Sequence, residues 1–591
     1  MKKILTLCCG LALVSSMSAK VVYVTANGND GNDGSSWEKS VATLAGAYAK
    51  AEAGDQIWMA GGTYVLPMDG DLAKETVMKD QVDIYGGFKV GDTSIDARER
   101  QDVEDLPYEF TNATIITSNN EVLPYRVLGR GGAYGNKDDA MWWKGATIDG
   151  LQFENLASTN AKLMHLNDHL TMRNCIVRHC GSAEFVVYFE GASLMENCLV
   201  EQNYRAAGAK QNYAVRICAS TIHNVPNDVK NVEFMENEVG ALHVFNYPET
   251  VGASRIENCV FDGNKNYNLT LLNQSPSAPM VIDRCVFTNN AFASNATTVG
   301  EGMTFTGQTE SPVAITRCAF LENTNTAAAE LDPKNAVVKL GTNMRMANSL
   351  FVDNACENHL LMWTQGHVIN CTFDGNKGSI CAVGMPSIIN NIFTNFTTTA
   401  EKTMVFADVE QGPEVRFNTL TADDVVAEGK MAVVDDFIAG VDATQYTNPT
   451  GYDYSLQAGS PAIGAGDVEL PESYMGYIDG TEVFEAGVEA FKLDIAGNAR
   501  YTNGKINLGC FEGGLEGDAI SSVAAENNAR VYAAEGALVV CTTDAQEVSV
   551  YSLNGQQVAS ATVKGGIRTI SVAEGMYLVK VGEQTYKAIV K

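Results

Sequence analysis

Five residues at matching positions of successive repeats carry most of the chemistry that this sequence offers. They are His165, Tyr188, Arg216, His243 and Thr270, and each lies between apolar residues of a short alternating segment. Stacked on one surface, His, Tyr and Arg side chains can bind a chain of sugars or supply the acid and base groups of a lyase. The alternative is an ordinary solvated strand face, because a shift of one residue in the alternation turns every side chain over. All seven histidines fall between residues 165 and 367, which favours a functional middle section.

Other polar groups give weaker signals. Three pairs of adjacent acids could resemble the two carboxylates of a glycoside hydrolase, but none lies at the matching position of a repeat strand. The pairs are Asp138–Asp139, Asp423–Asp424 and Asp435–Asp436. Gly366–His367 lacks the following glycine of the polygalacturonase histidine motif. Trp142 and Trp143, in an expected loop, could stack on sugar or anchor that loop to the solenoid.

One candidate metal site lies near the N-terminus. Asn29, Asp30, Asn32 and Asp33 could bind Ca²⁺, although their spacing does not match an EF-hand loop. A turn in a capping segment is the better interpretation of this Asn/Asp/Gly cluster. We therefore expect no required cofactor, with Ca²⁺ possible and the metal content open.

A recurring sequence motif indicates the fold that must position these candidate functional side chains. Residues 258–265 read NCVFDGNK, residues 370–377 read NCTFDGNK, and weaker copies lie around them. The cysteine-type position falls at Leu151, Cys175, Cys198, Val232, Cys259, Cys285, Cys318, Ser349, Cys371 and Ile392, in uneven steps of 21 to 34 residues. A repeat of this length predicts a solenoid with loops of variable length. It is too short for a helix in every unit, so we expect stacked coils of parallel strands.

Two further features recur in the repeats: an Asn after the marker and a second strand. An Asn lies five residues after the marker, at Asn203, Asn237, Asn264, Asn290, Asn323, Asn354 and Asn376, where it can form a turn and bond to its neighbour in the next coil. A second strand follows, over 185–189, 214–218, 241–245, 269–272 and 337–340. Leu, Val, Ser and Ile replace Cys at the marker, so we expect buried free thiols and not disulfides.

Composition limits the classes of function. The 591 residues contain 41 Lys and Arg and 71 Asp and Glu, a net charge of −30, which argues against nucleic acid as the main partner. Residues 1–19 have a basic start, an apolar stretch too short to span a bilayer and a run of small residues, which together predict a signal peptide. We expect an exported chain with no transmembrane segment after processing.

The segment at 22–64 resembles the start of secreted bacterial right-handed β-helix proteins of the pectate-lyase-like superfamily, of the polymorphic outer-membrane-repeat type. IYGGF at 84–88 fits the same group, and YSLQAGSPAIGAGD at 454–467 and DIAGNARYTNGKINLGCFE at 494–512 resemble its closing segment. The resemblance implies an N-terminal cap and first coils over 20–64 and a β-helix with its closing segment over 65–515. It implies no single activity. The cap itself is predicted to contain a helix over 41–53 that ends at Gly54.

The sequence pattern changes near the C-terminus. Residues 516–529 are predicted to form a linker, and 530–591 contain short alternating segments typical of a small β-sandwich. VYSLNGQQV at 550–558, EGMYLVKV at 574–581 and KAIVK at 587–591 resemble the type A sorting domain of type IX secretion in Bacteroidetes. This resemblance implies export across the outer membrane by that machinery, removal of the domain and attachment to the cell surface.

These observations predict an all-β protein: a right-handed parallel β-helix with an N-terminal cap, followed by a small β-sandwich. We expect a monomer that is secreted or held at the cell surface. Two functions stay open. One is binding or presentation to extracellular polysaccharide or a host surface. The other is a polysaccharide lyase or glycoside hydrolase that uses the face of His165, Tyr188, Arg216 and His243. A groove under the long insertions would favour the enzyme, and a flat face would favour binding.

Overall fold

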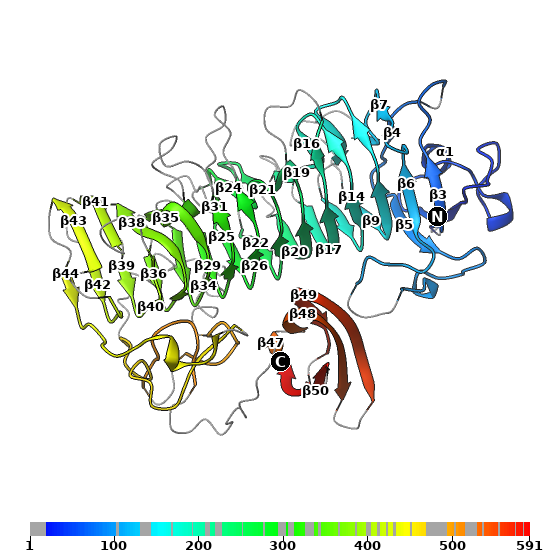
Figure 1. The fold of residues 1–591 in the computed structure, drawn as a ribbon. Coiled ribbons are helices and arrows are strands. Elements are labelled where there is room, and N and C mark those ends of the chain that lie inside the picture. The colour runs from blue at the N-terminus through cyan, green and yellow to red at the C-terminus, as the bar shows by residue number, and fades with distance from the viewer. Residues whose placement is uncertain are drawn as a thin grey trace, which may run out of the picture.

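Each coil of the chain contributes strands to three parallel sheets that run along the rod in Figure 1. The computed structural model describes residues 19–590 except 72, 102–105, 130–143, 167–168, 192, 207–212, 219–226, 251, 276–277, 293–302, 305–312, 326–335, 341–343, 365–366, 384–386, 398–403, 410–413, 421–423, 430–432, 450–451, 469–492, 501–503, 514–528, 535–536, 553–555, 574 and 583. The parallel β-helix predicted from the repeat is confirmed. Residues 1–18 of the predicted signal peptide and most of the predicted linker lie outside the described residues.

Sheets 1 and 2 share two strands, β17 (Ser193–Glu201) and β20 (Asp228–Met235), whose halves belong to one sheet each. The other strands of sheet 1 are β1 (Val21–Val24), β2 (Gln56–Ala60), β5 (Asp83–Phe88), β9 (Ala146–Asp149), β13 (Leu170–Arg173), β22 (Ser254–Glu257), β25 (Met280–Asp283), β29 (Val313–Thr316), β33 (Met344–Ala347), β36 (His367–Ile369), β39 (Ser387–Ile389), β42 (Glu414–Arg416) and β44 (Val433–Asp435). Those of sheet 2 are β3 (Gly62–Val65), β6 (Thr114–Thr117), β10 (Leu151–Glu154), β14 (Ile176–Arg178), β23 (Val260–Asp262), β26 (Val286–Thr288), β30 (Ala319–Leu321), β34 (Leu350–Val352), β37 (Thr372–Asp374) and β40 (Ile392–Thr394).

Sheet 3 consists of the second strands that the sequence predicts. Its first part contains β4 (Thr76–Val77), β8 (Leu128–Gly129), β12 (Lys162–Leu166), β16 (Phe185–Glu190), β19 (Tyr213–Cys218), β21 (Gly240–Asn246) and β24 (Leu269–Asn273). Its continuation contains β28 (Met303–Thr304), β32 (Ala336–Lys339), β35 (Ala355–Thr364), β38 (Lys377–Val383), β41 (Met404–Val409) and β43 (Val425–Gly429). Short strands precede it: β7 (Val122–Leu123), β11 (Ala157–Ser158), β15 (Gly181–Ser182), β18 (Tyr204–Arg205), β27 (Ala291–Phe292) and β31 (Thr324–Asn325).

The corner between sheets 1 and 2 explains why Asn precedes the marker cysteine. Asn174, Asn197, Asn258 and Asn370 all have φ between 53° and 55°, the left-handed region that Asn tolerates better than most residues. The chain turns there without a glycine. Asn therefore stands at this position because of backbone geometry, and the cysteine after it points into the core.

The Asn five residues after the marker forms the predicted ladder but not the predicted left-handed turn. From Asn203 to Asn376 each Nδ2 donates to the Oδ1 of the next Asn, at 2.8 to 3.2 Å. The positive φ belongs instead to the residue before each Asn, such as Gln202 or Asn289. The amide also donates to a carbonyl of the preceding coil, as Asn290 does to Phe261, so the buried group is fully bonded.

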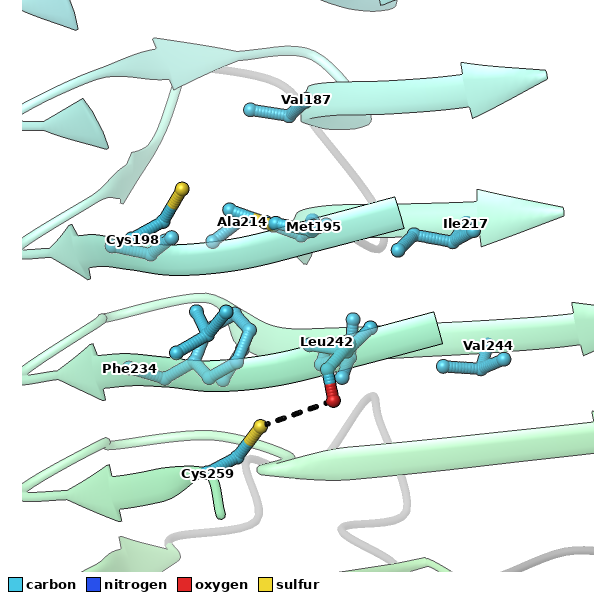
Figure 2. Close-up of a cluster of buried hydrophobic side chains, with 14 of the residues drawn as sticks. Val187, Met195, Cys198, Ala214, Ile217, Phe234, Leu242, Val244 and Cys259 are labelled. Atoms are coloured by element: carbon cyan, nitrogen blue, oxygen red, sulfur yellow. Dashed lines mark hydrogen bonds between the residues drawn. The ribbon is translucent and has the colours of Figure 1, made fainter. Parts of the chain in front are cut away.

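In successive coils the marker residue points inward, so the marker residues line the hydrophobic core along the rod. Figure 2 shows inward side chains from facing sheets meeting in this core, among them Cys198, Phe234 and Leu242. The ten cysteines whose side chains are described are free and buried, as predicted, and Cys259 donates to the carbonyl oxygen of Val229. Seven phenylalanines two residues after the marker stack with ring centres 4.5 to 4.9 Å apart: Phe234, Phe261, Phe287, Phe320, Phe351, Phe373 and Phe393.

The last predicted marker is wrong by one residue. Ile392 pairs with Thr372, so the residue that corresponds to Cys371 is Asn391. Its side chain accepts from the Cys371 backbone N–H at 2.8 Å and thus stabilises the rung above from inside. Because NNIF has two consecutive Asn residues, the sequence does not show which position corresponds to the marker.

The N-terminal cap contains a shorter helix than predicted. The helix α1 covers Leu44–Lys50, after the short 3₁₀ turn η1 (Trp37–Lys39). Thr43 caps it by accepting from the Gly46 N–H, and Asp30 accepts from the backbone of Ala42 and Thr43. The residues before Thr43 are therefore used in capping contacts, and the helix ends at Ala51, before Gly54. A second turn, η2 (Ile95–Ala97), lies in the loop that follows β5.

The closing segment folds back over the outer surface of sheet 2 and does not merely cover the last rung (Figure 1). It contains η4 (Ala443–Gln445) and the antiparallel pair β45 (Tyr446–Asn448) and β46 (Asp453–Leu456). Its apolar side chains pack on Leu350, Val352 and Ile392. The fully buried Arg500 holds it together through the carbonyls of Asn507 and Gly509 and the Glu512 carboxylate.

The C-terminal region is a small antiparallel sheet structure beside the rod (Figure 1). Its strands are β47 (Ala529–Ala534), β48 (Ala537–Ser552), β49 (Gln557–Ser571), β50 (Gly575–Val581) and β51 (Gln584–Val590). The antiparallel fold agrees with the predicted sandwich. Two pairs of predicted short strands are each one long strand, because β48 and β49 stay paired through an irregularity at Thr542–Ala545.

Candidate functional site

The predicted face lies on sheet 3, with its residues on adjacent rungs. The pairing places His165 beside Tyr188, Tyr188 beside Arg216, Arg216 beside His243, and His243 beside Thr270. Their neighbours Met164, Val187, Ile217, Leu242 and Leu271 are completely buried in the core. The five residues therefore point outward, as the alternation predicts, and we call them the sheet 3 face.

Aromatic rings surround the centre of the sheet 3 face. Phe185, Tyr188, Tyr213 and Phe245 form a buried cluster on this outer surface, with Tyr247 and Tyr267 packed against it. The Arg216 guanidinium carbon lies 5.1 Å from the centre of the Phe185 ring and 5.7 Å from those of Tyr188 and Phe245. Such rings attract a cation and partly shield it from water.

His165 is bonded at both ring nitrogens. Its Nε2 lies 2.5 Å from Glu190 Oε2, and its Nδ1 lies 3.4 Å from Arg126 Nη1. A guanidinium can only donate, so Nδ1 accepts and Nε2 carries the proton. Burial is the main cause that lowers the pKa of His165, which agrees with a neutral ring. Because both nitrogens are engaged, His165 stabilises the face and has no free atom for acid–base chemistry.

His243 is different. Both of its ring nitrogens are buried without a hydrogen-bond partner in the part of the chain that the structure describes. The ring centre lies 5.0 Å from that of Tyr213. Burial, assisted by the charge of Arg216, lowers the pKa of His243 to about 3, so the imidazole is neutral near pH 7. A neutral imidazole can donate one hydrogen bond and accept another, but it is a weak base.

The ends of the sheet 3 face differ in character. At one end Lys162 lies on the Tyr188 ring, with Nζ 3.8 Å from its centre, and burial lowers the pKa of this lysine. Burial likewise raises the pKa of Tyr188. At the other end Tyr213 bonds to Thr270, with 3.1 Å between the two hydroxyl oxygens. The face thus runs from cationic groups at the Lys162 and Arg216 rungs to neutral hydroxyls at Thr270.

The sequence did not indicate Lys162, Phe185, Tyr213 or Phe245 as members of this site. Lys162, Phe185 and Tyr213 stand first in their strands, off the outward alternation that singled out the five predicted residues. Phe245 lies two residues after His243, on the outward alternation, and could have been included. The excess of aromatic residues in β16, β19 and β21 was the available signal. Their convergence depends on the register between coils, which only the structure shows.

The other candidates that the structure describes do not assemble a second site. Asp30 is occupied by capping, Asn29 and Asp33 bond within their own turns, and Asn32 bonds to the Ser40 carbonyl. The better interpretation of this cluster, a turn in the cap, is therefore confirmed. Burial lowers the pKa of His367 to about 4, with the Arg345 charge adding to the effect. Asp138, Asp139, Trp142, Trp143, Gly366 and Asp423 lie outside the described residues, as do most of the long insertions, so the predicted groove is not tested.

Two further observations concern the described residues alone. They contain no group of three or more His, Cys, Asp or Glu side chains placed to hold a metal ion. None of their helices has the length and apolar character needed to cross a membrane. A cavity of about 570 Å³ lies away from the sheet 3 face, between sheet 2, residues 106–109 and the C-terminal sheet structure, and Glu201, Glu233 and Arg568 line it.

Comparison with known proteins identifies two regions. The family described as "Right handed beta helix region" matches residues 110–278, and the family described as "Domain of unknown function (DUF6383)" matches residues 519–590. No curated protein matches this chain in sequence.

Several solved structures are similar to this chain at low sequence identity. The pectate lyase Pel9A is 14% identical with a TM-score of 0.32, over 84% of this chain and 97% of that one. The catalytic unit of a GH87 alpha-1,3-glucanase from Streptomyces thermodiastaticus is 8% identical (TM-score 0.29; 68% and 65% covered). PfbA, a surface adhesin of Streptococcus pneumoniae, is 10% identical (TM-score 0.28; 66% and 91% covered). What these proteins do does not transfer at such similarity. The chain is thus a parallel β-helix that matches the right-handed β-helix family over residues 110–278, followed by a C-terminal region that matches a family of unknown function.

Proposed function

We propose that this protein binds extracellular carbohydrate through the sheet 3 face. The observation that carries the proposal is the cluster of Phe185, Tyr188, Tyr213 and Phe245 around Arg216 on the outside of the rod. Aromatic rings next to groups that form hydrogen bonds are the usual means by which proteins hold sugar rings. Sheet strands fix these groups rigidly at intervals of about 4.8 Å, which suits a repeating polymer.

Affinity electrophoresis of the full chain in gels that contain neutral or acidic polysaccharides tests this proposal. We expect at least one polymer to retard the chain, and Tyr188→Ala to weaken the retardation about tenfold. Tyr204→Ala is the matched control, because Tyr204 belongs to the short strand β18 outside sheet 3. Equal retardation of both variants, or none by any polymer, would contradict the proposal.

A polysaccharide lyase or hydrolase is the second candidate. The free nitrogens of His243 are the observation in its favour, since a base must have an unbonded atom to accept a proton. Its depressed pKa makes it a poor base, so binding is the better supported function. Release of reducing ends by the full chain that disappears in His243→Gln would establish the enzyme instead.

We also propose export to the cell surface, with residues 1–19 as signal peptide and 530–591 as a type IX sorting domain. The resemblance of VYSLNGQQV and EGMYLVKV to such domains supports this assignment. In a bacterium with this machinery, the full chain should reach the surface and lose the C-terminal domain. A chain that ends at residue 529 should stay in the periplasm, and its appearance at the surface would overturn the assignment.

A further inference from the structure

The charge on the sheet 3 face is not neutralised as it is elsewhere on the rod. Three arginines of sheets 1 and 2 have carboxylate partners: Arg173 Nε lies 2.9 Å from Asp149, Arg178 Nε 2.8 Å from Glu201, and Arg255 Nη1 3.2 Å from Glu257. Arg216 has no carboxylate at ion-pair distance within the described residues. In a chain with a net charge of −30 an unpaired arginine stands out, because carboxylates are abundant.

Buried nitrogen atoms without partners gather at the same place. Arg216 Nε and both nitrogens of His243 are buried and have no hydrogen bond in the described part of the chain. The two residues are directly paired on neighbouring strands, so these atoms belong to one spot. A buried donor with no acceptor costs about 1–3 kcal/mol, and such groups usually have a ligand or water as their missing partner.

We propose that Arg216 and His243 form a subsite for an anionic substituent of the bound glycan, a carboxylate or a sulfate ester. This inference rests on the proposed function and names the class of ligand. The anion accepts from Arg216 Nε and from the protonated nitrogen of neutral His243, which supplies both missing acceptors. The rings of Phe185, Tyr188 and Phe245 keep water away from the guanidinium, and a charge-assisted hydrogen bond is stronger in such surroundings.

The neighbouring groups limit where the charge can lie. Glu190 is bonded to His165, and its negative charge repels an anion at that end of the face. Thr270 and Tyr213 at the other end offer neutral hydroxyls, which suit the hydroxyl groups of a sugar. Lys162 adds a second cation two rungs from Arg216. The subsite therefore selects for one acidic group and leaves the adjacent sugar to neutral contacts.

The test uses the full chain and three polymers with one backbone: dextran, carboxymethyl-dextran and dextran sulfate, beside a panel of natural acidic and neutral polysaccharides. We expect tighter binding to acidic polymers, weakened by added salt. The carboxylated and sulfated arms show which anion is preferred. Arg216→Gln should weaken binding to acidic polymers about tenfold or more, and Arg216→Lys should lose less because it keeps the charge. Arg255→Gln is the matched control, since Arg255 is a paired arginine of sheet 1.

The outcomes separate this inference from the proposed function. Neutral polymers that bind as tightly as acidic ones, or Arg216→Gln that binds acidic polymers as the unchanged protein does, would overturn the anion subsite while glycan binding stands. Failure of every polymer to bind would overturn both. Thermal melting of each variant guards against unfolding, and His243→Gln provides an independent loss of binding should Arg216→Gln not fold.

Discussion

At the scale of single residues, a buried polar side chain raises or lowers the stability of the fold depending on whether all of its hydrogen bonds are formed. The Asn290 amide is buried and fully bonded, so it stabilises the stack of coils. The His243 imidazole is half-buried with both nitrogens unbonded, so it lowers stability in the free protein and is available to a ligand. His165 has both nitrogens engaged and resembles Asn290 in this respect. Bonding state, and not residue type, separates structural from functional candidates here.

Replacement of one rung of the ladder tests the structural side. Asn290→Ala removes the acceptor of the Asn264 amide and backbone N–H and the donor to Phe261 and Asn323. We expect the free energy of unfolding to fall by about 2–4 kcal/mol, measured by urea denaturation. The neighbouring Asn289→Gly keeps the left-handed backbone at an exposed position and should change it by less than about 1 kcal/mol. A small effect of Asn290→Ala would contradict the importance of the ladder.

Acid should destabilise the protein through His243. Its pKa is about 3 in the folded protein but about 6.5 in an unfolded chain, so only the unfolded state takes up this proton as pH falls below 6.5. Stability conferred by the neutral ring is therefore present above pH 6.5 and lost on acidification, by about 2 kcal/mol at pH 5. The fall in unfolding free energy between pH 7 and pH 5 should be smaller by this amount in His243→Gln. The exposed His179→Gln is the control, and an equal fall in both variants would contradict the burial of His243.

At the scale of elements, most of the coil could be predicted because the same motif of marker residue, Asn and alternating strand recurs in many repeats. The marker cysteines gave the phase, and the alternation around Met164 and Val187 then placed the outward residues correctly. Where one local signal stood alone, the prediction failed. The doubled Asn at 390–391 shifted the last marker, and the bent strand β48 was divided in two because Thr542–Ala545 interrupts its alternation. The aromatic cluster around Arg216 depends on contacts between coils, and the excess of aromatic residues in β16, β19 and β21 does not by itself show that these residues meet.

The closing segment should depend on one buried side chain. Arg500→Met removes its contacts with Asn507, Gly509 and Glu512 and takes the positive charge away from the buried Glu512 carboxylate, which keeps the Asn507 N–H. Loss of one member of a buried pair typically costs about 3–5 kcal/mol, and the segment would then be held on the coils by its packing and by hydrogen bonds such as that from the Cys510 N–H to Thr372. We expect limited proteolysis to cut within 493–513 much faster, with Leu350 and Ile392 uncovered. The exposed Lys505→Met is the control, and unchanged cleavage in Arg500→Met would show that the remaining packing and hydrogen bonds suffice.

At the scale of the whole molecule, one hydrophobic core runs from the cap through the coils, the closing segment and the sheet 3 face add separate buried clusters outside it, and cysteines lie in all three. Ten cysteines are buried and free, from Cys175 in an early coil to Cys510 in the closing segment. Burial raises the pKa of Cys180 and Cys510 to about 12, so neither forms the reactive thiolate near neutral pH. A chain with Cys381→Ser and Cys541→Ser that begins at residue 20 should show almost no reaction with Ellman's reagent when folded and ten thiols in denaturant. Rapid labelling of a few thiols in the folded chain would locate a gap in the core, and fewer than ten in denaturant would reveal disulfides that contradict the free thiols.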